Sequence, residues 1–513
     1  MRAEVKKSVP NSISRMAFVA LSVFLQVLWI IALVVRVNEY YAEISILTSV
    51  ISFVVVLYLY GKDGNTALKM PWIMLILVFP VWGLSFYFLC GQSFNAKKMQ
   101  RRFENLGREM NGILSQDKEI AEKLKKENLA IANQSSYIWN YGHTPIYQNT
   151  DVKFFPEAVQ GYQSMIADMK AAKKFIFMEY FAIEDADAFA AIKEVLAAKV
   201  KEGVEVRIFY DDVGSVGFIN PKFARQLEEL GIQCRIFNPL IPLLNMFMNN
   251  RDHRKITVID GEIAYTGGYN LANEYFNMTH PYGYWKDTGV RLEGEAVKSY
   301  TVMLLEMWNA MEHTDLSYER FFPQKDLAWK NDGYVQPYAD NPLDGERVGE
   351  NVYMNIIKNA KRYVYFVTPY LIITDEMKRE LGLAAKRGVD VRILTPGIPD
   401  KKLIYRITRS YYASLVRDGV RIFEYTPGFC HAKECICDDE VATVGTINMD
   451  YRSLYLHFED GVYLYQCSAV ADMLKDYQDM ISVSEEVTEM YRQSSKLRLS
   501  IGQCLLRIIA PLL

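Results

Sequence analysis

The sequence predicts an α/β fold made of two similar halves, preceded by hydrophobic helices that anchor the chain in a membrane. Three observations support this: apolar runs stand near the N-terminus, one motif occurs twice, and strand-like and helix-like stretches alternate around each copy. Such alternation is typical of a mixed sheet covered by helices. With 513 residues, the chain is long enough for two or more packed units.

Composition narrows the function classes. Hydrophobic residues make up 50% of the chain, which allows for a membrane part. The formal net charge of −3 gives no overall positive field, so composition argues against a nucleic-acid partner. The 7 cysteines are an odd number without a disulfide-framework spacing, which fits a reducing compartment.

Residues 1–94 are predicted to form a membrane-anchoring region. The apolar runs in this region cover residues 16–35, 44–60 and 70–90. The first run is long enough to span a bilayer, and because a second run follows at once, an anchor is favoured over a secretory signal peptide. Pro80 and Gly83 interrupt the third run. We therefore expect two spans and an interfacial or re-entrant third segment.

Basic residues flank the apolar region on both sides, and the positive-inside rule draws both flanks to the cytoplasm. We expect a multi-pass membrane protein whose catalytic part faces the cytoplasm. Residues 95–145 form a basic, helix-permissive connector, which lies either near anionic headgroups or in solvent. Residues 491–513 place apolar side chains at helical spacing, so this amphipathic tail is either an interfacial helix or packs on the preceding domain.

The region between connector and tail contains an internal repeat. The matching segments are 171–178 with 359–366, 203–208 with 388–393, and 230–237 with 417–423. We therefore predict a first half at 146–345 and a second half at 346–490. The polar stretch 313–349, which contains several Pro and Asp residues, is expected to link them.

Each half contains one copy of the motif H-x-K-x-x-x-x-D. Its residues are His253, Lys255 and Asp260 in the first copy and His431, Lys433 and Asp438 in the second. Residues two apart on a strand face the same side, so the His and Lys of a copy share one face. A neutral His can be a nucleophile or a general acid/base near pH 7, and Lys suits phosphate oxygens. Each Asp lies on the other face of a continuing strand, which favours a structural role.

Both copies continue at the same offset to a glycine-containing step and an asparagine, Asn270 and Asn448. Glycine lets the backbone approach a ligand closely, and an asparagine amide can donate to a phosphate oxygen. One His-x-Lys pair alone would be a surface coincidence. Two copies with matching Asp, Gly and Asn offsets instead predict a phosphate-handling active site.

At these residues the sequence resembles the phospholipase D superfamily, which is marked by two such HKD motifs. The flanking segments 251–255, 265–270, 283–287 and 448–453 look like those of bacterial cardiolipin synthases. The resemblance implies a duplicated phospholipase D-like fold, in which two α/β/α halves pack about a pseudo-two-fold axis and bring both motifs into one pocket. It covers nearly the whole chain.

The resemblance also implies a role for two carboxylates. Asp287 and Glu459 occupy matching positions after the motifs and are expected to hydrogen-bond the motif histidines and fix their tautomers. A surface carboxylate is the alternative. The sequence departs from the family at His457, which stands where the family usually has Asn, close to Glu459.

The function implied is cardiolipin synthesis. A phosphatidyl group passes from one phosphatidylglycerol to another through a phosphatidyl-histidine, giving cardiolipin and glycerol. His253 is assigned as nucleophile and His431 as general acid/base, although the similarity of the motifs leaves the reverse open. A hydrolytic phospholipase D or another phosphatidyltransferase, making phosphatidylserine or phosphatidylethanolamine, is the alternative. A nuclease with HKD motifs would instead have a basic groove and no anchor.

The partners implied are phosphatidylglycerol, cardiolipin and the lipid bilayer of a bacterial cell membrane, with no nucleic acid. We expect no metal and no cofactor, because Lys255 and Lys433 supply positive charge at the phosphate. The sequence leaves a homo-oligomer open.

Overall fold

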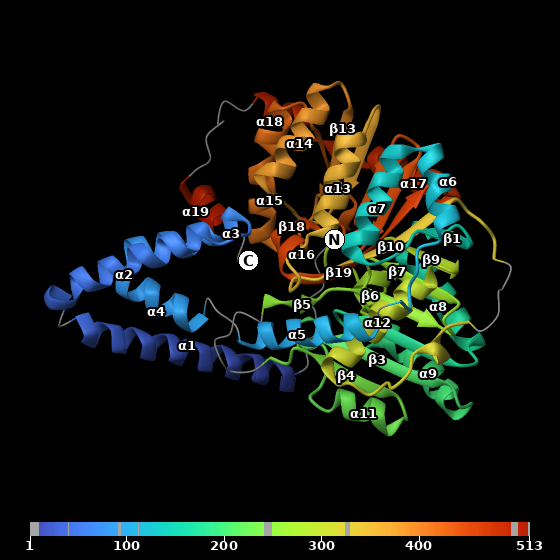
Figure 1. Cartoon of the computed structure of the whole chain (residues 1–513), viewed down its shortest axis with the longest axis horizontal. Coiled ribbons are helices and arrows are strands. Elements are labelled where there is room, and N and C mark those ends of the chain that lie inside the picture. The colour runs from blue at the N-terminus through green and yellow to red at the C-terminus, as the bar shows by residue number, and fades with distance from the viewer. Residues whose placement is uncertain are drawn as a thin grey trace.

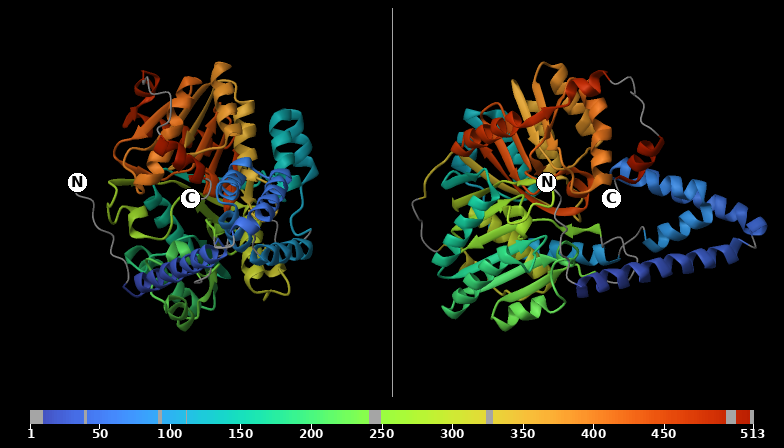
Figure 2. Two further views of the ribbon diagram at one scale, coloured as in Figure 1. Left: turned by 90° about the vertical axis from the view of Figure 1, so that its left-hand side faces the viewer. Right: turned by 180° about the vertical axis from the view of Figure 1, so that it is seen from behind.

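The computed structural model describes residues 10–38, 41–90, 94–110, 112–240, 249–323, 329–493 and 501–510. Two α/β halves lie one above the other, and the N-terminal helices extend to one side of them (Figures 1 and 2). The predicted α/β class and the duplication are both confirmed.

The first half is built on a seven-stranded mixed sheet with the order β1-β9-β7-β6-β2-β3-β4. Helices α8 (Ala158–Ala171) and α9 (Asp187–Lys201) cover its outer face through a hydrophobic cluster that they share with β2 and β3. The strands are β1 Thr150–Phe155, β2 Phe175–Tyr180, β3 Glu205–Asp211, β4 Gln233–Phe237, β6 Lys255–Ile259, β7 Ile263–Gly267 and β9 Gly289–Gly294.

The second sheet repeats this order strand for strand as β10-β19-β17-β16-β11-β13-β14, with β20 added at the edge. Helices α13 (Val348–Asn359), α14 (Asp375–Lys386) and α15 (Lys402–Arg417) cover its outer face. The strands are β10 Tyr334–Asp340, β11 Tyr363–Val367, β13 Asp390–Pro396, β14 Arg421–Tyr425, β16 Glu434–Cys437, β17 Val441–Gly445, β19 His457–Tyr465 and β20 Ser484–Glu486. Strand β10 lies within the stretch predicted as a linker and before the expected boundary at 345–346.

One hydrophobic core joins the halves. Ile256 and Val258 of the first sheet and Ile436 and Val444 of the second belong to the same buried cluster. Helices α12 (Val297–Met311) and α17 (Ser468–Ser482) contribute to this cluster and lie between the sheets. Because the halves share a core, the loops that carry the motifs are held against each other by packed apolar surface.

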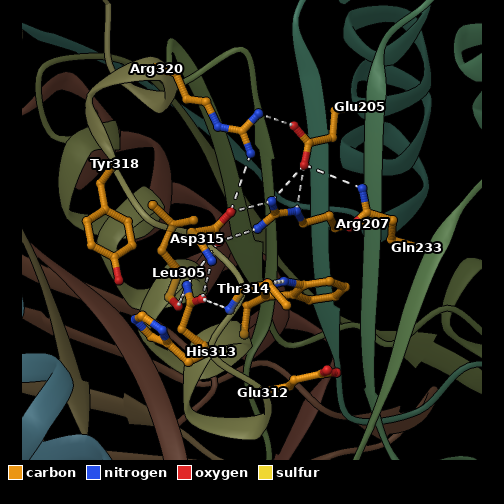
Figure 3. A network of polar contacts seen from close by, with 12 residues as sticks. Glu205, Arg207, Gln233, Leu305, Glu312, His313, Thr314, Asp315, Tyr318 and Arg320 are labelled. Atoms are coloured by element: carbon orange, nitrogen blue, oxygen red, sulfur yellow. Dashed lines mark hydrogen bonds and ion pairs between the residues drawn. The ribbon is translucent and has the colours of Figure 1, made fainter.

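A buried ion pair fixes the chain after α12 to the first half (Figure 3). The Arg207 guanidinium donates two hydrogen bonds of 2.7 Å to Asp315 and one of 2.8 Å to Glu205. Asn309 donates to the same Asp315 carboxylate at 3.0 Å. A bidentate Arg–carboxylate pair fixes geometry as well as adding attraction, so this contact orients the segment that leads to the second half.

The N-terminal part is helical. The apolar runs form α1 (Pro10–Asn38), α2 (Tyr41–Gly61), α3 (Thr66–Val78) and α4 (Pro80–Cys90). The third predicted run is thus two helices, because Pro80 lacks a backbone N–H and starts a new helix after Phe79. Within the described ranges, no helix combines the length and the apolarity needed to cross a membrane. The predicted transmembrane helices are therefore not supported.

The connector and the tail are also helical. The connector forms α5 (Phe94–Glu109), α6 (Lys118–Glu127) and α7 (Leu129–Gly142). Helix α18 (Thr488–Gln493) runs into the start of the tail, and the tail contains α19 (Ile501–Ile509). Helix α19 lies against α15, where Arg507 donates to the Ser410 carbonyl oxygen at 2.6 Å. In its described part, the tail therefore packs on the domain.

Candidate active site

Each motif begins just after a short strand that is exchanged between the halves and pairs with a strand of the other half. Strand β5 (Arg251–Asp252) of the first half pairs in parallel with β19, and β15 (Gly428–Cys430) of the second half pairs in parallel with β8 (Tyr284–Lys286). The residue that follows each of these short strands is a motif histidine. The His253 backbone N–H donates to the Phe458 carbonyl at 2.9 Å, and the His431 backbone N–H donates to the Lys286 carbonyl at 2.7 Å.

This exchange pairs each motif histidine with a carboxylate of the opposite half. Nδ1 of His253 lies 2.9 Å from Oε2 of Glu459, and Nδ1 of His431 lies 2.7 Å from Oδ2 of Asp287. Both carboxylates are fully buried. Because a carboxylate accepts hydrogen bonds, each Nδ1 carries the proton and each Nε2 is left for chemistry.

Further donors fix the two carboxylates. The Thr446 hydroxyl donates to Oε2 of Glu459 at 2.5 Å. The Thr288 backbone N–H donates to Oδ1 of Asp287 at 3.0 Å, and the Trp285 indole N–H points to Oδ2 at 3.5 Å. The histidine rings are thus held by groups that are themselves held, as in other sites where a third group orients the base.

The motif lysines lie beside the histidines, as the two-residue spacing predicts. Nζ of Lys255 donates to the His253 carbonyl, and Nζ of Lys433 donates to the His431 carbonyl and lies 2.9 Å from its Nδ1. Burial lowers the pKa of Lys255 to about 8 and that of Lys433 to about 7. Both ammonium groups are therefore poised to gain a bound anion as a partner.

Charged groups of each half act on the motif histidine of the other half. Burial, and then the charges of Lys255, Lys433 and His431, hold the pKa of His253 well below its usual value. Two of these groups belong to the other half. Burial and the charge of Lys433 lower the pKa of His431 to about 4, against the opposing effect of Asp287. Both imidazoles are therefore neutral near pH 7, the state that a nitrogen nucleophile requires.

The pKa of Asp287 is lowered as well. Burial raises the pKa of this carboxyl, but the charges of His431 and Lys433 more than offset burial and hold it below its ordinary value. Asp287 is therefore ionised near pH 7 and accepts a hydrogen bond from Nδ1–H of His431. Aromatic rings surround His431 at centroid distances of 5.3 Å for Trp285, 5.4 Å for Tyr275 and 5.7 Å for Phe429.

The two asparagines lie near the site in different states. Asn270 accepts from the Ala182 N–H at 3.1 Å and donates to the Tyr275 hydroxyl at 2.7 Å. Asn448 is buried, and its Oδ1 has no hydrogen-bond partner among the described residues. Their contact with phosphate stays a prediction.

The motif aspartates bind backbone at the far ends of the motif strands. Asp260, with φ of 56°, accepts from the N–H groups of Lys173, Lys174 and Phe175 at 2.7–2.9 Å. Asp438, with φ of 55°, accepts in the same way from the N–H groups of residues 361, 362 and 363. Each aspartate ties the start of a neighbouring strand to a turn, which is the structural role that strand geometry favours.

One residue that spacing alone did not place in the site is His457. In the described part of the chain, the ligand atoms of His253, His457 and Glu459 lie within 4.8 Å of one another, a group that could hold a metal ion. Burial is the main cause that lowers the pKa values of His253 and His457, and the nearby positive charges of Lys255, Lys433 and Arg452 lower them further. These neighbours would repel a metal cation. The side chains of His253, His457 and Glu459 are therefore better suited to hydrogen bonds with one another than to metal binding.

Known proteins resemble this chain over most of its length. The family model described as "Cardiolipin synthase, PLD-like domain" matches residues 165–308 and 353–481. An uncharacterized protein of Streptococcus mutans is 41% identical over 89% of this chain and 99% of its own. The cardiolipin synthase of Alkalihalophilus pseudofirmus is 31% identical over 89% of this chain and 91% of its own.

A solved structure shares the fold. The crystal structure of phosphatidylserine synthase from Haemophilus influenzae Rd KW20 matches with a TM-score of 0.55 at 13% identity, over 74% of this chain and 98% of the other. Two phospholipase D-like domains with paired motifs make this protein a phosphatidyltransferase of the phospholipase D superfamily. Within that class, the chain belongs to the cardiolipin synthase family.

Proposed function

We propose that the protein makes cardiolipin and glycerol from two molecules of phosphatidylglycerol by way of a phosphatidyl-histidine. Nε2 of His253 attacks the phosphorus of the first lipid, and the bond from phosphorus to the glycerol headgroup oxygen breaks. His431, protonated, gives its proton to the departing oxygen. The headgroup hydroxyl of the second lipid then loses its proton to His431 and attacks phosphorus, and the phosphorus–nitrogen bond breaks.

The observation that carries this proposal is the pair of carboxylate-held histidines in one site. Asp287 and Glu459 each occupy one Nδ1, so both Nε2 atoms are available to the phosphodiester. Dividing the displacement into two steps through a covalent intermediate is nucleophilic catalysis. Two histidines suit this two-step reaction. One must be neutral to attack phosphorus, and the other must carry the proton that the leaving oxygen receives.

The proton on His431 needs a second anion besides Asp287. The pKa of His431 is about 4 without substrate, mainly because burial disfavours the imidazolium. A bound phosphodiester brings a negative charge, which favours the imidazolium and raises this pKa. Lys255 and Lys433 would face the non-bridging phosphate oxygens with Asn270 and Asn448 and stabilise the charge that develops in the transition state.

We also propose that the N-terminal helices associate with the bilayer that holds the substrate. Large apolar side chains on α1 and α2 are exposed, among them Phe18 at 63%, Trp29 at 66% and Phe53 at 60%. Exposed apolar surface of this kind marks contact with lipid or protein. A lipid substrate makes a bilayer the fitting partner.

The test is lipid analysis by mass spectrometry after purified protein has acted on phosphatidylglycerol vesicles in the presence of a chelator. The proposal predicts cardiolipin and glycerol in equal amounts. Phosphatidic acid as the only lipid product would make the enzyme a hydrolase. His253→Ala, purified in the same way, is the matched control for contaminating activity.

A further inference from the structure

Trp285 and His457 occupy equivalent places in the two halves. Each stands two residues before the carboxylate that holds a motif histidine. Trp285 lies on β8, opposite Phe429 of β15, and His457 lies on β19, opposite Arg251 of β5. When the two halves are matched strand by strand, Trp285 and His457 therefore fall at the same position.

Both rings pack against the histidine that their neighbouring carboxylate holds. The ring centroids of Trp285 and His431 are 5.3 Å apart, and those of His457 and His253 are 5.4 Å apart. Each ring also turns a nitrogen toward the carboxylate. Trp285 Nε1 lies 3.5 Å from Oδ2 of Asp287, and His457 Nδ1 lies 3.6 Å from Oε1 of Glu459.

In the second half, buried polar atoms of Glu459 and His457 have no hydrogen-bond partner among the described residues. Oε2 of Glu459 accepts from Thr446 and faces His253, whereas Oε1 has no hydrogen-bond partner among the described residues. Both ring nitrogens of His457 are likewise unpartnered there, although the residue is only 7% exposed. A buried donor and a buried acceptor each cost free energy when unpaired, and these two groups face each other.

We propose that His457 is a positioning residue for the His253 step: its Nδ1–H donates to Oε1 of Glu459 and completes a chain from His457 through Glu459 to His253. The inference rests on the proposed function, because His253 is the nucleophile there. A carboxylate only accepts, so the chain requires the Nδ1–H tautomer of a neutral His457.

This donor has two effects on Glu459. It holds the second carboxylate oxygen, so that the oxygen facing His253 cannot rotate away. It also draws negative charge from the carboxylate, which leaves His253 less readily protonated. Trp285 gives Asp287 a donor that cannot titrate in this range. Burial lowers the pKa of His457 to about 3, so His457 stays a neutral donor across the working range.

Other charged groups act on the hydrogen-bonded series of His457, Glu459 and His253, and these groups must stay constant in any test. The groups that lower the pKa of His253 by their charge are Lys255, Lys433, His431 and Lys401, and those that lower the pKa of His457 in this way are Arg452 and His253. None of them is altered by a substitution at position 457.

Two substitutions separate the donor from the ring. His457→Phe keeps a ring against His253 and removes the donor, whereas His457→Asn removes the ring and keeps an N–H donor. The readout is the rate of phosphatidyl-enzyme formation from labelled phosphatidylglycerol, measured by rapid quench across pH. Trp285→Phe is the matched control in the other half.

We expect His457→Phe to slow formation about tenfold, the effect of one hydrogen bond to a charged group, and to raise the apparent pKa of the step. His457→Asn should stay near the parent rate and pKa. The inference would be overturned if His457→Phe and His457→Asn slowed formation of the phosphatidyl-enzyme equally, or if His457→Phe kept the parent rate. If His457→Phe does not fold, His457→Met also lacks an N–H donor and replaces it.

A double substitution checks that His457 acts through Glu459. In a Glu459→Gln background, His457→Phe should cause little further loss, and a full additional tenfold loss would contradict the chain. Failure of this inference is distinct from failure of the proposed function. In the first case the parent still makes cardiolipin, and in the second it does not.

Discussion

The two half-sites share one plan and differ in its details. In each, a carboxylate from the opposite half holds a motif histidine, and a ring packs against that histidine. The His253 site uses Glu459 and His457, whereas the His431 site uses Asp287 and Trp285. In the His431 site alone, the motif lysine also lies 2.9 Å from Nδ1 of its histidine. A duplicated unit thus supplies two equivalent histidines, and nearby substitutions give them different surroundings.

The largest predicted effect comes from removing either histidine. His253→Ala and His431→Ala should each abolish cardiolipin synthesis while the protein still folds. Loss of a general acid or base alone typically costs about 10²–10⁴-fold, and loss of the nucleophile should cost more.

A phosphatidyl ester with a good leaving group sharpens this comparison, because departure of that group needs no proton. His431→Ala should still form the phosphatidyl-enzyme from such an ester, and His253→Ala should not. Stopped-flow release of a chromogenic leaving group measures the difference. Equal bursts from both variants would mean that the histidines are interchangeable.

The next effect concerns the exchanged carboxylates. Glu459→Gln and Asp287→Asn keep the size of the side chain and remove its charge, so the imidazolium loses a stabilising neighbour. We expect kcat to fall about 10–100-fold, as for other groups that orient an active-site histidine. Because Glu459 pairs with His253, its variant should slow formation of the intermediate, whereas Asp287→Asn should also slow its resolution. Parent rates in both variants would exclude the proposed pairing.

A smaller effect concerns the lysines and pH. The cationic form of each lysine is lost as the pH rises through its pKa, which burial lowers to about 7 for Lys433 and about 8 for Lys255. The value of kcat/KM, which reports the free enzyme, should therefore fall above about pH 7. Lys433→Arg stays charged and should move this fall toward the pKa of Lys255, at some cost in rate because a guanidinium has another shape. An unchanged profile would show that Lys433 does not set the alkaline limb.

The smallest effect on rate is expected at the motif aspartates. Asp260→Ala removes three hydrogen bonds to backbone and strains a residue with φ of 56°. The free energy of unfolding should fall by about 1–3 kcal/mol. Denaturant titration measures this loss, and Asp260→Asn, which tolerates the same backbone conformation, should lose less. A loss of kcat in folded Asp260→Ala comparable to that of the histidine variants would give the aspartate a catalytic role.

Much of the fold was predictable because it was duplicated. Matching strand segments and motif offsets predicted two similar α/β halves. Because alternate residues of a strand face the same side, the spacing also predicted that Lys255 lies beside His253 and that Asp260 lies on the opposite face. The resemblance to the family predicted that Asp287 and Glu459 hold the motif histidines. These predictions rest on local spacing or on a repeat, both of which can be read along the chain.

Other features depend on contacts that spacing does not encode. The pairing of β5 with β19 and of β15 with β8, an exchange between the halves, places each motif histidine against the carboxylate of the other half, and no residue near either motif signals it. The position of His457 beside His253 arises from the same exchange. The apolar runs predicted transmembrane helices, yet among the described residues no helix is both long and apolar enough to cross a membrane. In the third run, Pro80 divides the apolar stretch into α3 and α4.

The most direct test of one shared site with unequal histidines is to locate the covalent intermediate. The enzyme is quenched during turnover of labelled phosphatidylglycerol, digested under conditions that preserve phosphohistidine, and its peptides are analysed by mass spectrometry. The account predicts one phosphatidyl group per chain, on the peptide that contains His253, and none on the peptide that contains His431. Label on both histidines would mean two independent half-sites and would contradict it.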